Sequence, residues 1–581
     1  MDDRQYAFLA RQPSAALKTR DAFWGMPKRG LAFLLANVMF WQPMWAQADG
    51  IVVSAPGTSL GQAGNGVPVV NIAKPNGSGL SHNQFKDYNV GSNGVILNNA
   101  TNAAQSTQLG GIILGNPNLQ GTAAKVILNE VNGGNPSQLR GYTEVAGQSA
   151  HVIVANPYGI TCNGCGFINT PKATLTTGKP IIENGQVGRY QVDQGSVAIE
   201  GAGLNANNVD RFEIITRSAK INAEIQAKNL TIVAGRNDVN ANTLNATARA
   251  DDGSAKPELA IDSSALGGMY AGAIKLVGTE AGVGVKLDGK MVASGGDIQL
   301  DANGHLSLAQ TAAAGAVDID AKSLETRGQV YAGSRLRVKT QGDLTNQNNL
   351  VARDSIHLDS GGTLSNNGII EAGVYADNSR NTTGDVTLIA KQLNNGGKTV
   401  IASRDLNITT TAALNNQGGT LSGQGKTTVT GNVVDNRNKG RILGNTELHL
   451  SADQVLNSQG GLINSQGLLT ANLGHLENNA GELSSLNSAT LVLGSLDNLT
   501  GLVMAGKNLD ITNTGAINNR GGELSSQGVM TVRTASLDNS NKGTVAANGK
   551  LLVSATGAVN NAERPARQPC CRGRVRCCQS E

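Results

Sequence analysis

The sequence predicts an all-β fold, specifically a right-handed parallel β-helix (β-solenoid) with an N-terminal cap and extra-helical hairpins. Three observations carry this prediction. A three-residue phrase, apolar then polar then usually Asn, returns every 20 to 22 residues between residues 393 and 561. Apolar and polar residues alternate between the phrases, which is the period of a strand. Gly and Asn fill the breaks, where turns need positive φ. The phrase begins at Leu393, Leu414, Val434, Leu456, Leu476, Leu496, Ile517, Leu537 and Val559.

A leucine-rich repeat is the structural alternative, because its units have a similar length. That architecture needs a denser leucine pattern and room for a helical segment in each unit. Here Gly and Asn interrupt the chain every few residues, which favours short strands joined by tight corners. At about 20 residues per coil, the chain beyond residue 48 is long enough for about 26 coils.

The composition fits a narrow solenoid and argues against a nucleic-acid partner. The chain has 581 residues, 74 Gly and only 3% aromatic residues. Residues 1–48 hold six basic and three acidic residues and residues 563–581 hold five and two, so each end contributes +3. The formal net charge of +4 therefore leaves −2 for residues 49–562. A nearly neutral body has no basic face of the kind that binds nucleic acid.

The first 48 residues predict a signal peptide. A basic region precedes the apolar run 31–45, and Ala46-Gln47-Ala48 supplies the small-x-small pattern for cleavage between Ala48 and Asp49. A membrane anchor is the alternative, but about 15 residues broken by polar residues and a proline are too few to span a bilayer.

Residues 49–250 are rich in Gly and Asn without the regular phrase, and they contain two short motifs. The run 81–90, Ser-His-Asn-Gln-Phe-Lys-Asp-Tyr-Asn-Val, comes before them. The first motif is Asn116, Pro117, Asn118 and Leu119. The second is Asn156, Pro157, Tyr158, Gly159 and Ile160. Read locally, each is a turn, because Pro sets φ while Asn and Gly supply the special conformations.

These motifs resemble the secretion domain of two-partner secretion exoproteins, the family of filamentous haemagglutinins and contact-dependent growth inhibition toxins. The second motif departs from the family's Asn-Pro-Asn-Gly-Ile at Tyr158. The 20-residue units resemble the family's haemagglutinin repeats. The resemblance implies capture in the periplasm by an outer-membrane β-barrel transporter that recognises the domain carrying the two motifs. The alternative is that the motifs are only corners required for folding.

We expect five regions: a signal peptide at 1–48, a two-partner secretion domain at 49–250, a transition β-helix at 251–340, haemagglutinin repeats at 341–562 and an Arg/Cys-rich tail at 563–581. An earlier copy of the phrase begins at Leu364, and the interval from there to Leu393 is 29 residues. About nine residues near 374–383 are therefore expected to leave the coil as a loop. The tail breaks the repeat and suggests a reading frame lost within the array; a basic or metal-binding tail is the alternative.

Cys162 and Cys165 are the only cysteines between residues 49 and 562. The helical context of a redox site and the second ligand pair of a zinc site are both missing. Oxidising conditions after export therefore favour a disulfide, with free thiols as the alternative. We expect no metal, no cofactor and no enzymatic activity.

Asparagines that recur at equivalent corners can stack into amide ladders. This hypothesis predicts that Asn415 and Asn436 lie near one line; the alternative is that they are solvent-exposed turn residues.

The expected function is that of a secreted or surface-presented filamentous adhesin, exported by a two-partner secretion transporter and bound to an unidentified receptor on a host or neighbouring cell. The alternative is the N-terminal fragment of a contact-dependent growth inhibition toxin. A polysaccharide lyase or hydrolase is a third hypothesis, but it needs a cluster of charged residues that the Ser-, Asn- and Thr-rich units do not offer.

Overall fold

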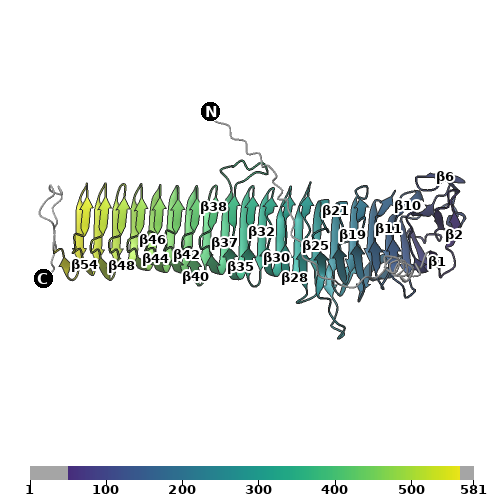
Figure 1. Ribbon diagram of the computed structural model, residues 1–581, viewed down its shortest axis with the longest axis horizontal. Coiled ribbons are helices and arrows are strands. Elements are labelled where there is room, and N and C mark those ends of the chain that lie inside the picture. The colour runs from purple at the N-terminus through teal and green to yellow at the C-terminus, as the bar shows by residue number, and fades with distance from the viewer. Residues whose placement is uncertain (1–49, 563–581) are drawn as a thin grey trace, which may run out of the picture. The chain divides into compact units, whose positions relative to one another are not determined.

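Residues 50–562 form a parallel β-solenoid of about 21 turns, described here from a computed structural model (Figure 1). The expected parallel β-solenoid is thereby confirmed, and the described residues contain no α-helix. The estimate of 26 coils was too high, because two antiparallel sheets leave the stack near its N-terminal end. The predicted signal peptide with its Ala48–Asp49 cleavage site and the Arg/Cys-rich tail lie outside the described residues.

Three columns of parallel strands make the three faces of the solenoid, and each coil adds a rung to each column. The first column contains β3 (Pro68–Asn71), β5 (Val95–Asn99), β10 (Tyr142–Gly147), β13 (Cys165–Ile168), β18 (Leu204–Ala206), the first part of β21 (Ile225–Ala234), the first part of β25 (Met269–Gly278), β27 (Met291–Ala293), β29 (Thr311–Ala313), β31 (Val330–Ala332), β34 (Asn349–Ala352), β36 (Ile369–Ala372), β38 (Thr399–Ala402), β41 (Thr420–Gly423), β43 (Arg441–Gly444), β45 (Leu462–Ser465), β47 (Glu482–Ser485), β49 (Leu502–Ala505), β52 (Glu523–Ser526) and β55 (Thr544–Ala547).

The second column follows the first in each coil. It contains β4 (Leu80–Tyr88), β8 (Val126–Val131), β11 (His151–Ala155), β14 (Lys172–Thr176), β19 (Arg211–Thr216), the second parts of β21 and β25, β28 (Ile298–Leu308), β30 (Val317–Thr326), β32 (Arg335–Thr340), β35 (Ser355–Asn366), β37 (Asp385–Asn394), β39 (Leu406–Thr410), β42 (Lys426–Asp435), β44 (Glu447–Leu456), β46 (Leu468–Glu477), β48 (Ala489–Asp497), β50 (Leu509–Asn513), β53 (Met530–Thr534) and β56 (Leu551–Ala555).

The third column completes the coil, and several long strands run into it from the second. It contains β9 (Ser137–Leu139), β12 (Ile160–Cys162), β17 (Ser196–Ile199), β20 (Ser218–Ile221), β24 (Leu259–Ser263), β26 (Gly284–Leu287), β33 (Leu344–Asn346), β40 (Ala413–Asn415), β51 (Ala516–Asn518), β54 (Ser536–Asp538), β57 (Val559–Asn560) and the ends of β28, β30, β35, β37, β42, β44, β46 and β48.

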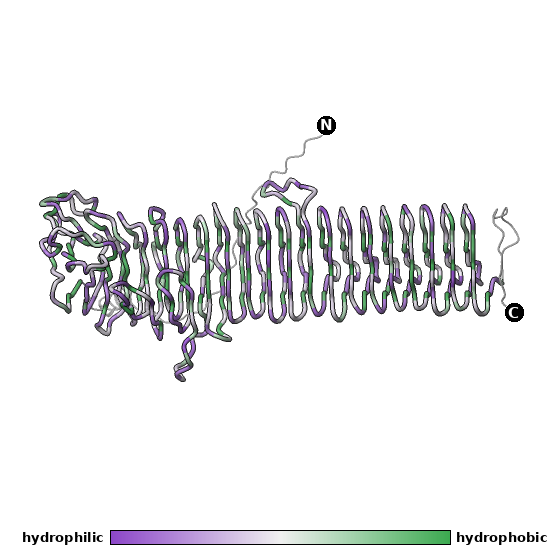
Figure 2. Tube along the Cα trace, turned by 180° about the vertical axis from the view of Figure 1, so that it is seen from behind, coloured by the Kyte–Doolittle hydropathy of each residue, from purple (hydrophilic) through white to green (hydrophobic). Residues whose placement is uncertain are grey.

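One continuous apolar core fills the interior of the solenoid, because alternate side chains of the stacked strands point inward. In β44 the buried residues Leu448, Leu450 and Ala452 alternate with more exposed neighbours. Figure 2 shows the same alternation of apolar and polar residues along the coils. Burial of apolar surface contributes about 25 cal/mol per Å², and each coil obtains it only by stacking on its neighbours.

Antiparallel strands form the expected N-terminal cap and extra-helical hairpins. β1 (Ile51–Val53) pairs with β4, and β2 (Ser59–Gln62) pairs with β3. A hairpin of β6 (Ala104–Thr107) and β7 (Gly111–Leu114) leaves the first coils, followed by the 3₁₀ turn η1 (Pro117–Leu119). A four-stranded sheet joins β15 (Lys179–Glu183), β16 (Gln186–Val192), β22 (Asn237–Asn240) and β23 (Ala246–Ala248).

The four-stranded sheet covers a second apolar cluster outside the solenoid interior. Tyr190 and Val192 from this sheet pack with Leu128 and Ile153 from the second column. The strands on both sides of this cluster are therefore apolar on two faces, so their sequences lack the simple alternation found in the later repeats.

A buried amide ladder runs through the repeats, and it corrects the predicted alignment by one residue. Asn416 Nδ2 donates to Asn436 Oδ1 over 2.7 Å, and both side chains are fully buried. Asn415 instead lies opposite Asp435 and donates to Asn394. The reason is that Leu414 points inward and Asn415 outward, so the next residue turns back into the interior. The ladder comprises Asn346, Asn366, Asn395, Asn416, Asn436, Asn457, Asn478, Asn498, Asn519, Asn539 and Asn561.

The ladder also corrects the fourth phrase of the array. Val434 pairs with Val455, which is buried, whereas Leu456 is more exposed. That phrase is therefore Val455-Leu456-Asn457, one residue earlier than the prediction. The expected loop is confirmed: residues 373–384 leave the stack between β36 and β37 and project from it near β37 (Figure 1).

Candidate functional site

The first Asn-Pro motif is a corner that ties three segments together. Asn116 caps η1 by accepting a hydrogen bond from the Asn118 N–H over 2.9 Å. Its Nδ2 donates to Asn98 O over 2.8 Å and to Ile72 O over 2.9 Å. Pro117 occupies the first helical position, where its missing N–H costs no hydrogen bond. The Asn116 side chain is buried and has its hydrogen-bonding groups satisfied.

The rest of this motif divides between the core and the surface. Asn118 Nδ2 donates to Asn71 O over 3.1 Å, which attaches the corner to β3. Leu119 is fully buried in the main core, whereas Pro117 is exposed. Pro117 is thus the residue of this motif that offers most surface to a partner.

The second motif is a similar corner, held by the side-chain hydrogen bonds of its leading asparagine, between the second and third columns. Asn156 is fully buried and accepts from the Tyr158 N–H over 2.9 Å. Its Nδ2 donates to Asn135 O over 2.9 Å and Ser137 Oγ over 3.0 Å. Gly159 has φ +122°, where a Cβ would lie 3.2 Å from the Ser196 carbonyl oxygen, so glycine is required there.

Tyr158 is the exposed residue of the second motif, with 47% of its surface accessible. Ile160 begins β12 and is buried, and Pro157 is half-buried. In both motifs the leading asparagine is therefore part of the fold. Recognition of these residues by a transporter stays a prediction, and the geometry supports a folding role for Asn116 and Asn156.

A groove of about 460 Å³ lies beside Tyr158, between the second corner and the four-stranded sheet. Pro157, Tyr158 and Glu130 line it from the solenoid, and Lys179 and Gln191 line it from the sheet. Sequence reasoning missed this groove because it missed the four-stranded sheet.

A signal for part of that sheet is nevertheless present in the sequence. Asn184-Gly185 separates two strand-like runs, and this dipeptide is typical of a two-residue hairpin. The structure has positive φ at both positions, 53° and 75°, and places them at the β15–β16 turn.

Glu130 gives the groove a negative charge on the side of the solenoid. Burial alone would raise the pKa of its carboxyl group, but the hydrogen bond and charge of His82, followed by smaller contributions that include the charge of Lys179, outweigh burial and lower the pKa. The His82 Nε2 to Glu130 Oε2 distance is 2.6 Å. The carboxylate is therefore ionised at neutral pH.

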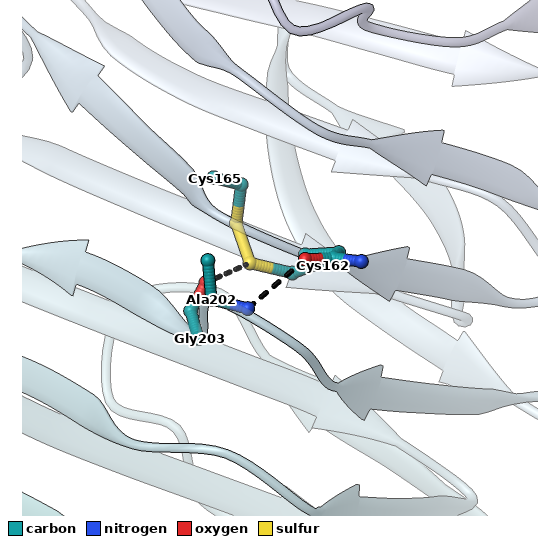
Figure 3. Close-up of a disulfide and its surroundings, with 5 residues drawn as sticks. Cys162, Cys165, Ala202 and Gly203 are labelled. Atoms are coloured by element: carbon teal, nitrogen blue, oxygen red, sulfur yellow. Dashed lines mark hydrogen bonds between the residues drawn. A yellow bond between two sulfur atoms is a disulfide. The ribbon is translucent and has the colours of Figure 1, made fainter.

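Cys162 and Cys165 form a disulfide at the corner between β12 and β13 (Figure 3). Their Cα atoms are 5.4 Å apart, and both side chains are buried. The Cys162 sulfur lies 3.4 Å from the Gly203 carbonyl oxygen of the next coil. Across residues 50–562 no group of three or more His, Cys, Asp or Glu side chains is placed to hold a metal ion. In the same range, no helix is long and apolar enough to cross a bilayer.

Comparisons with known proteins match nearly all of the described chain. The model of the TPS secretion domain matches residues 48–308. The model of the haemagglutinin repeat matches residues 312–368, 382–472, 444–494 and 474–562.

Relatives with curated descriptions are similar over part of this chain. One is a "16S rRNA endonuclease CdiA" of Enterobacter cloacae, 49% identical over 344 residues, which are 59% of this chain and 10% of that protein. Another is a "tRNA nuclease CdiA" of Escherichia coli strain STEC_O31, 43% identical over 411 residues, which are 70% of this chain and 12% of that protein. The chain thus spans about a tenth of the length of these relatives.

A solved structure of a filamentous haemagglutinin secretion domain is also similar in sequence. It is 34% identical, and the match covers 56% of this chain and 95% of that one, with a TM-score of 0.40.

Proposed function

Because this chain belongs to the two-partner secretion exoproteins of the filamentous haemagglutinin and contact-dependent growth inhibition family, we propose that it is a filamentous adhesin carried to the cell surface by a dedicated outer-membrane transporter. Proteins of this family are exported to the surface or secreted. The transporter is an outer-membrane β-barrel with periplasmic recognition domains. We also propose that the protein binds an unidentified receptor on a host or neighbouring cell and that it binds no nucleic acid.

The observation that carries the proposal is the continuity of the stack across the two family matches. β28 ends at Leu308, where the secretion-domain match ends, and β30 lies within the repeat match. These strands pair in parallel in both the second and third columns. A secretion domain that continues coil by coil into a repeat array is suited to an exported shaft, since each coil folds on the one before it.

We assign transporter contact to the surface of the two Asn-Pro corners rather than to their buried asparagines. Pro117 and Tyr158 are exposed, and Tyr158 borders the groove beneath the four-stranded sheet. Asn116 and Asn156 hold the corners in shape. An exposed tyrosine beside a groove is a common anchor in protein interfaces.

A second candidate function follows from the relatives, which are described as nucleases or toxins. In that case this chain is the N-terminal, non-catalytic part of a contact-dependent growth inhibition toxin, and the shaft presents a distant toxic domain. In both candidates we propose that the described coils perform no catalysis and bind no cofactor.

Export is tested by producing the full chain in a Gram-negative host with and without a two-partner secretion transporter. We expect surface or medium protein, measured by immunoblot and protease accessibility, only when the transporter is present. Equal export without a transporter would contradict the proposal.

Two corner variants separate recognition from folding. Tyr158→Ala should lower export several-fold while circular dichroism of the purified chain stays unchanged. Asn156→Ala should lower both export and the circular dichroism signal of folded protein, because it leaves buried hydrogen-bonding partners unpaired. Leu486→Ala, at an exposed position in the repeats, is the matched control and should export normally. If Tyr158→Ala exports as well as this control, Tyr158 is not a contact residue.

Adhesion and growth inhibition are distinguished on producing cells. Binding of such cells to epithelial cells or erythrocytes supports the adhesin, whereas binding confined to neighbouring bacteria, without killing, supports the toxin fragment. A downstream gene remnant for a toxin, with a small immunity gene, would favour the second candidate.

A further inference from the structure

The loop at residues 373–384 is an insertion between two strands of the solenoid. Twelve residues separate Ala372, the end of β36, from Asp385, the start of β37. The same link has two residues, 353 and 354, between β34 and β35. On either side of the loop, β36 pairs in parallel with β38 of the next coil and β37 with β35 of the preceding coil. The haemagglutinin-repeat matches stop at residue 368 and resume at 382. Insertions of this kind in repeat proteins are commonly the parts that bind ligands.

Hydrogen bonds and an ion pair hold this loop in one conformation. Within the loop, Tyr375 N–H donates to Ser379 O over 2.9 Å. Asn381 Nδ2 donates to Arg353 O over 2.8 Å, which attaches the loop to the coil before it. Arg380 pairs with Glu371 on β36 over 2.7 Å. A loop that is fixed before binding loses less conformational entropy when a ligand arrives.

The loop folds back over outward-facing side chains of the first column. Tyr331, Val351 and Glu371 are aligned on neighbouring rungs and point away from the core. Val351 is nevertheless only 8% exposed, and Val374 of the loop is buried as well. Beside them lies a groove of about 430 Å³, with the strand face as its floor and the loop as one wall. This volume is in the range of sites for small ligands.

Aromatic rings and amides dominate the chemistry of this groove. Tyr331 lies on the strand face and Tyr375 on the loop, where it is 42% exposed. Four carboxamide side chains also line the groove, those of Gln310, Gln329, Asn349 and Asn378. Flat rings pack against the C–H faces of pyranose sugars, and amides both donate to and accept from hydroxyl groups.

We propose that this groove, between the 373–384 loop and the strands β29, β31, β34 and β36, binds an uncharged oligosaccharide, with Tyr331 and Tyr375 packing against the sugar rings. The site is separate from the Asn-Pro corners. It extends the proposed adhesive role to a ligand class but is tested on purified protein, so a failure of export leaves it unaffected.

The charges around the groove favour a neutral sugar over an acidic one. The guanidinium of Arg380 is paired with Glu371, and that of Arg353 is paired with Asp354 over 2.8 Å. Hydrogen bonds from Ser379 lower the pKa of the loop residue Asp377, so this carboxylate adds a negative charge. An acidic sugar would meet no unpaired cation here and one nearby anion.

The first experiment measures saturation-transfer NMR of the purified full chain with four probes: lactose, chitobiose, cellobiose and maltose. We expect at least one probe to bind and Tyr331→Ala and Tyr375→Ala each to weaken that binding about tenfold or more. Leu486→Ala, whose side chain is exposed far along the array, should bind normally. The proposal is overturned if no probe binds or if both tyrosine variants bind like the parent chain.

A second variant tests the loop without disturbing the coil. Removing residues 374–383 joins Gly373 to Gly384 and restores the two-residue link found between β34 and β35. Circular dichroism and thermal unfolding should match the parent, whereas sugar binding should be lost. Retained binding would place the sugar elsewhere and overturn the proposal.

An acidic probe tests the charge argument. Sialyllactose should bind more weakly than the neutral probe that binds most tightly, or not at all. Tighter binding of sialyllactose would overturn the assignment to an uncharged sugar.

Discussion

Each asparagine of the buried ladder forms hydrogen bonds with the ladder asparagines of the neighbouring coils. Asn416 accepts from Asn395 over 2.8 Å and donates to Asn436 over 2.7 Å and to the Arg441 carbonyl oxygen over 3.1 Å. The amides all donate in the same direction along the array, so each hydrogen bond polarises the next. A fully satisfied buried amide stabilises the coil, whereas a half-satisfied one is costly.

Neighbouring asparagines provide a matched test of the ladder. We expect Asn416→Ala to destabilise its coils by about 2–4 kcal/mol, because it leaves buried amide and carbonyl groups unpaired. Asn415→Ala should cost under about 1 kcal/mol, since that side chain is partly exposed. Hydrogen exchange of peptides from residues 393–444 measures the difference. Equal loss of protection in both variants would contradict the ladder's role.

His151 is a residue whose protonation opposes folding. Its Nε2 lies 2.9 Å from Thr174 Oγ1, which donates to Glu213 over 2.8 Å. Desolvation, and after it the positive charges of Lys172 and Arg211, lower the pKa of His151 from 6.5 to about 3. Because the folded pKa lies below the unfolded one, the unfolded state binds more protons between pH 6.5 and 3.

The stability of the secretion domain should therefore fall as pH drops through this window, and part of the fall belongs to His151. Urea midpoints of the parent chain and His151→Gln, followed by circular dichroism at pH 7, 5 and 4, test this. The advantage of the parent over the variant should shrink as pH decreases. A difference that stays constant across these pH values would exclude the linkage.

At the scale of single elements, corners carry the specialised chemistry while strands supply repetition. The disulfide, both Asn-Pro motifs and the 373–384 loop all lie where one column passes to the next. Corners tolerate this variety because the paired strands on either side keep the register. The same tolerance explains how a four-stranded sheet leaves the stack without interrupting it.

The disulfide closes a very short loop, so its contribution to stability should be small. Loop closure over four residues corresponds to about 2 kcal/mol. We expect the Cys162→Ser/Cys165→Ser variant to fold and to be exported, with a modest loss of stability. Complete loss of folding would show that the pair does more than close this corner.

The oxidation state of the pair is measured separately by alkylation and mass spectrometry. The tryptic peptide 141–172 contains these two cysteines and no other. It should stay unmodified in denaturant until a reductant is added. Alkylation without reductant would indicate free thiols instead.

At the scale of the whole molecule, folding of residues 50–562 is a one-dimensional process. Every coil from β3 to β55 bonds mainly with the coils beside it. The first coils are closed by antiparallel strands, so they form an end on which later coils can be added. Such local folding is suited to a chain that emerges from a transporter from one end.

Proline substitutions at the two ends of the stack test whether folding assists export. Ile127 lies in β8 and Ile511 in β50, and both are fully buried. Ile127→Pro breaks pairing in an early coil and should slow export in a pulse–chase experiment, whereas Ile511→Pro should have a smaller effect. Unchanged export of Ile127→Pro would contradict folding-assisted export.

The period of the array, the alternation within it and the secretion motifs were readable in the sequence, because each depends on residues close together along the chain. The 29-residue interval likewise indicated the loop before 393. These local patterns predict coils, corners and family membership.

The tertiary structure alone decided which asparagine of each phrase is buried, how the four-stranded sheet covers the groove at Tyr158, and how Tyr375 meets the strand face of Tyr331. The physical reason is that these features depend on where a corner turns the chain and on which distant segments it brings together. A repeating sequence carries the spacing of its coils but leaves the direction of each corner to packing between coils.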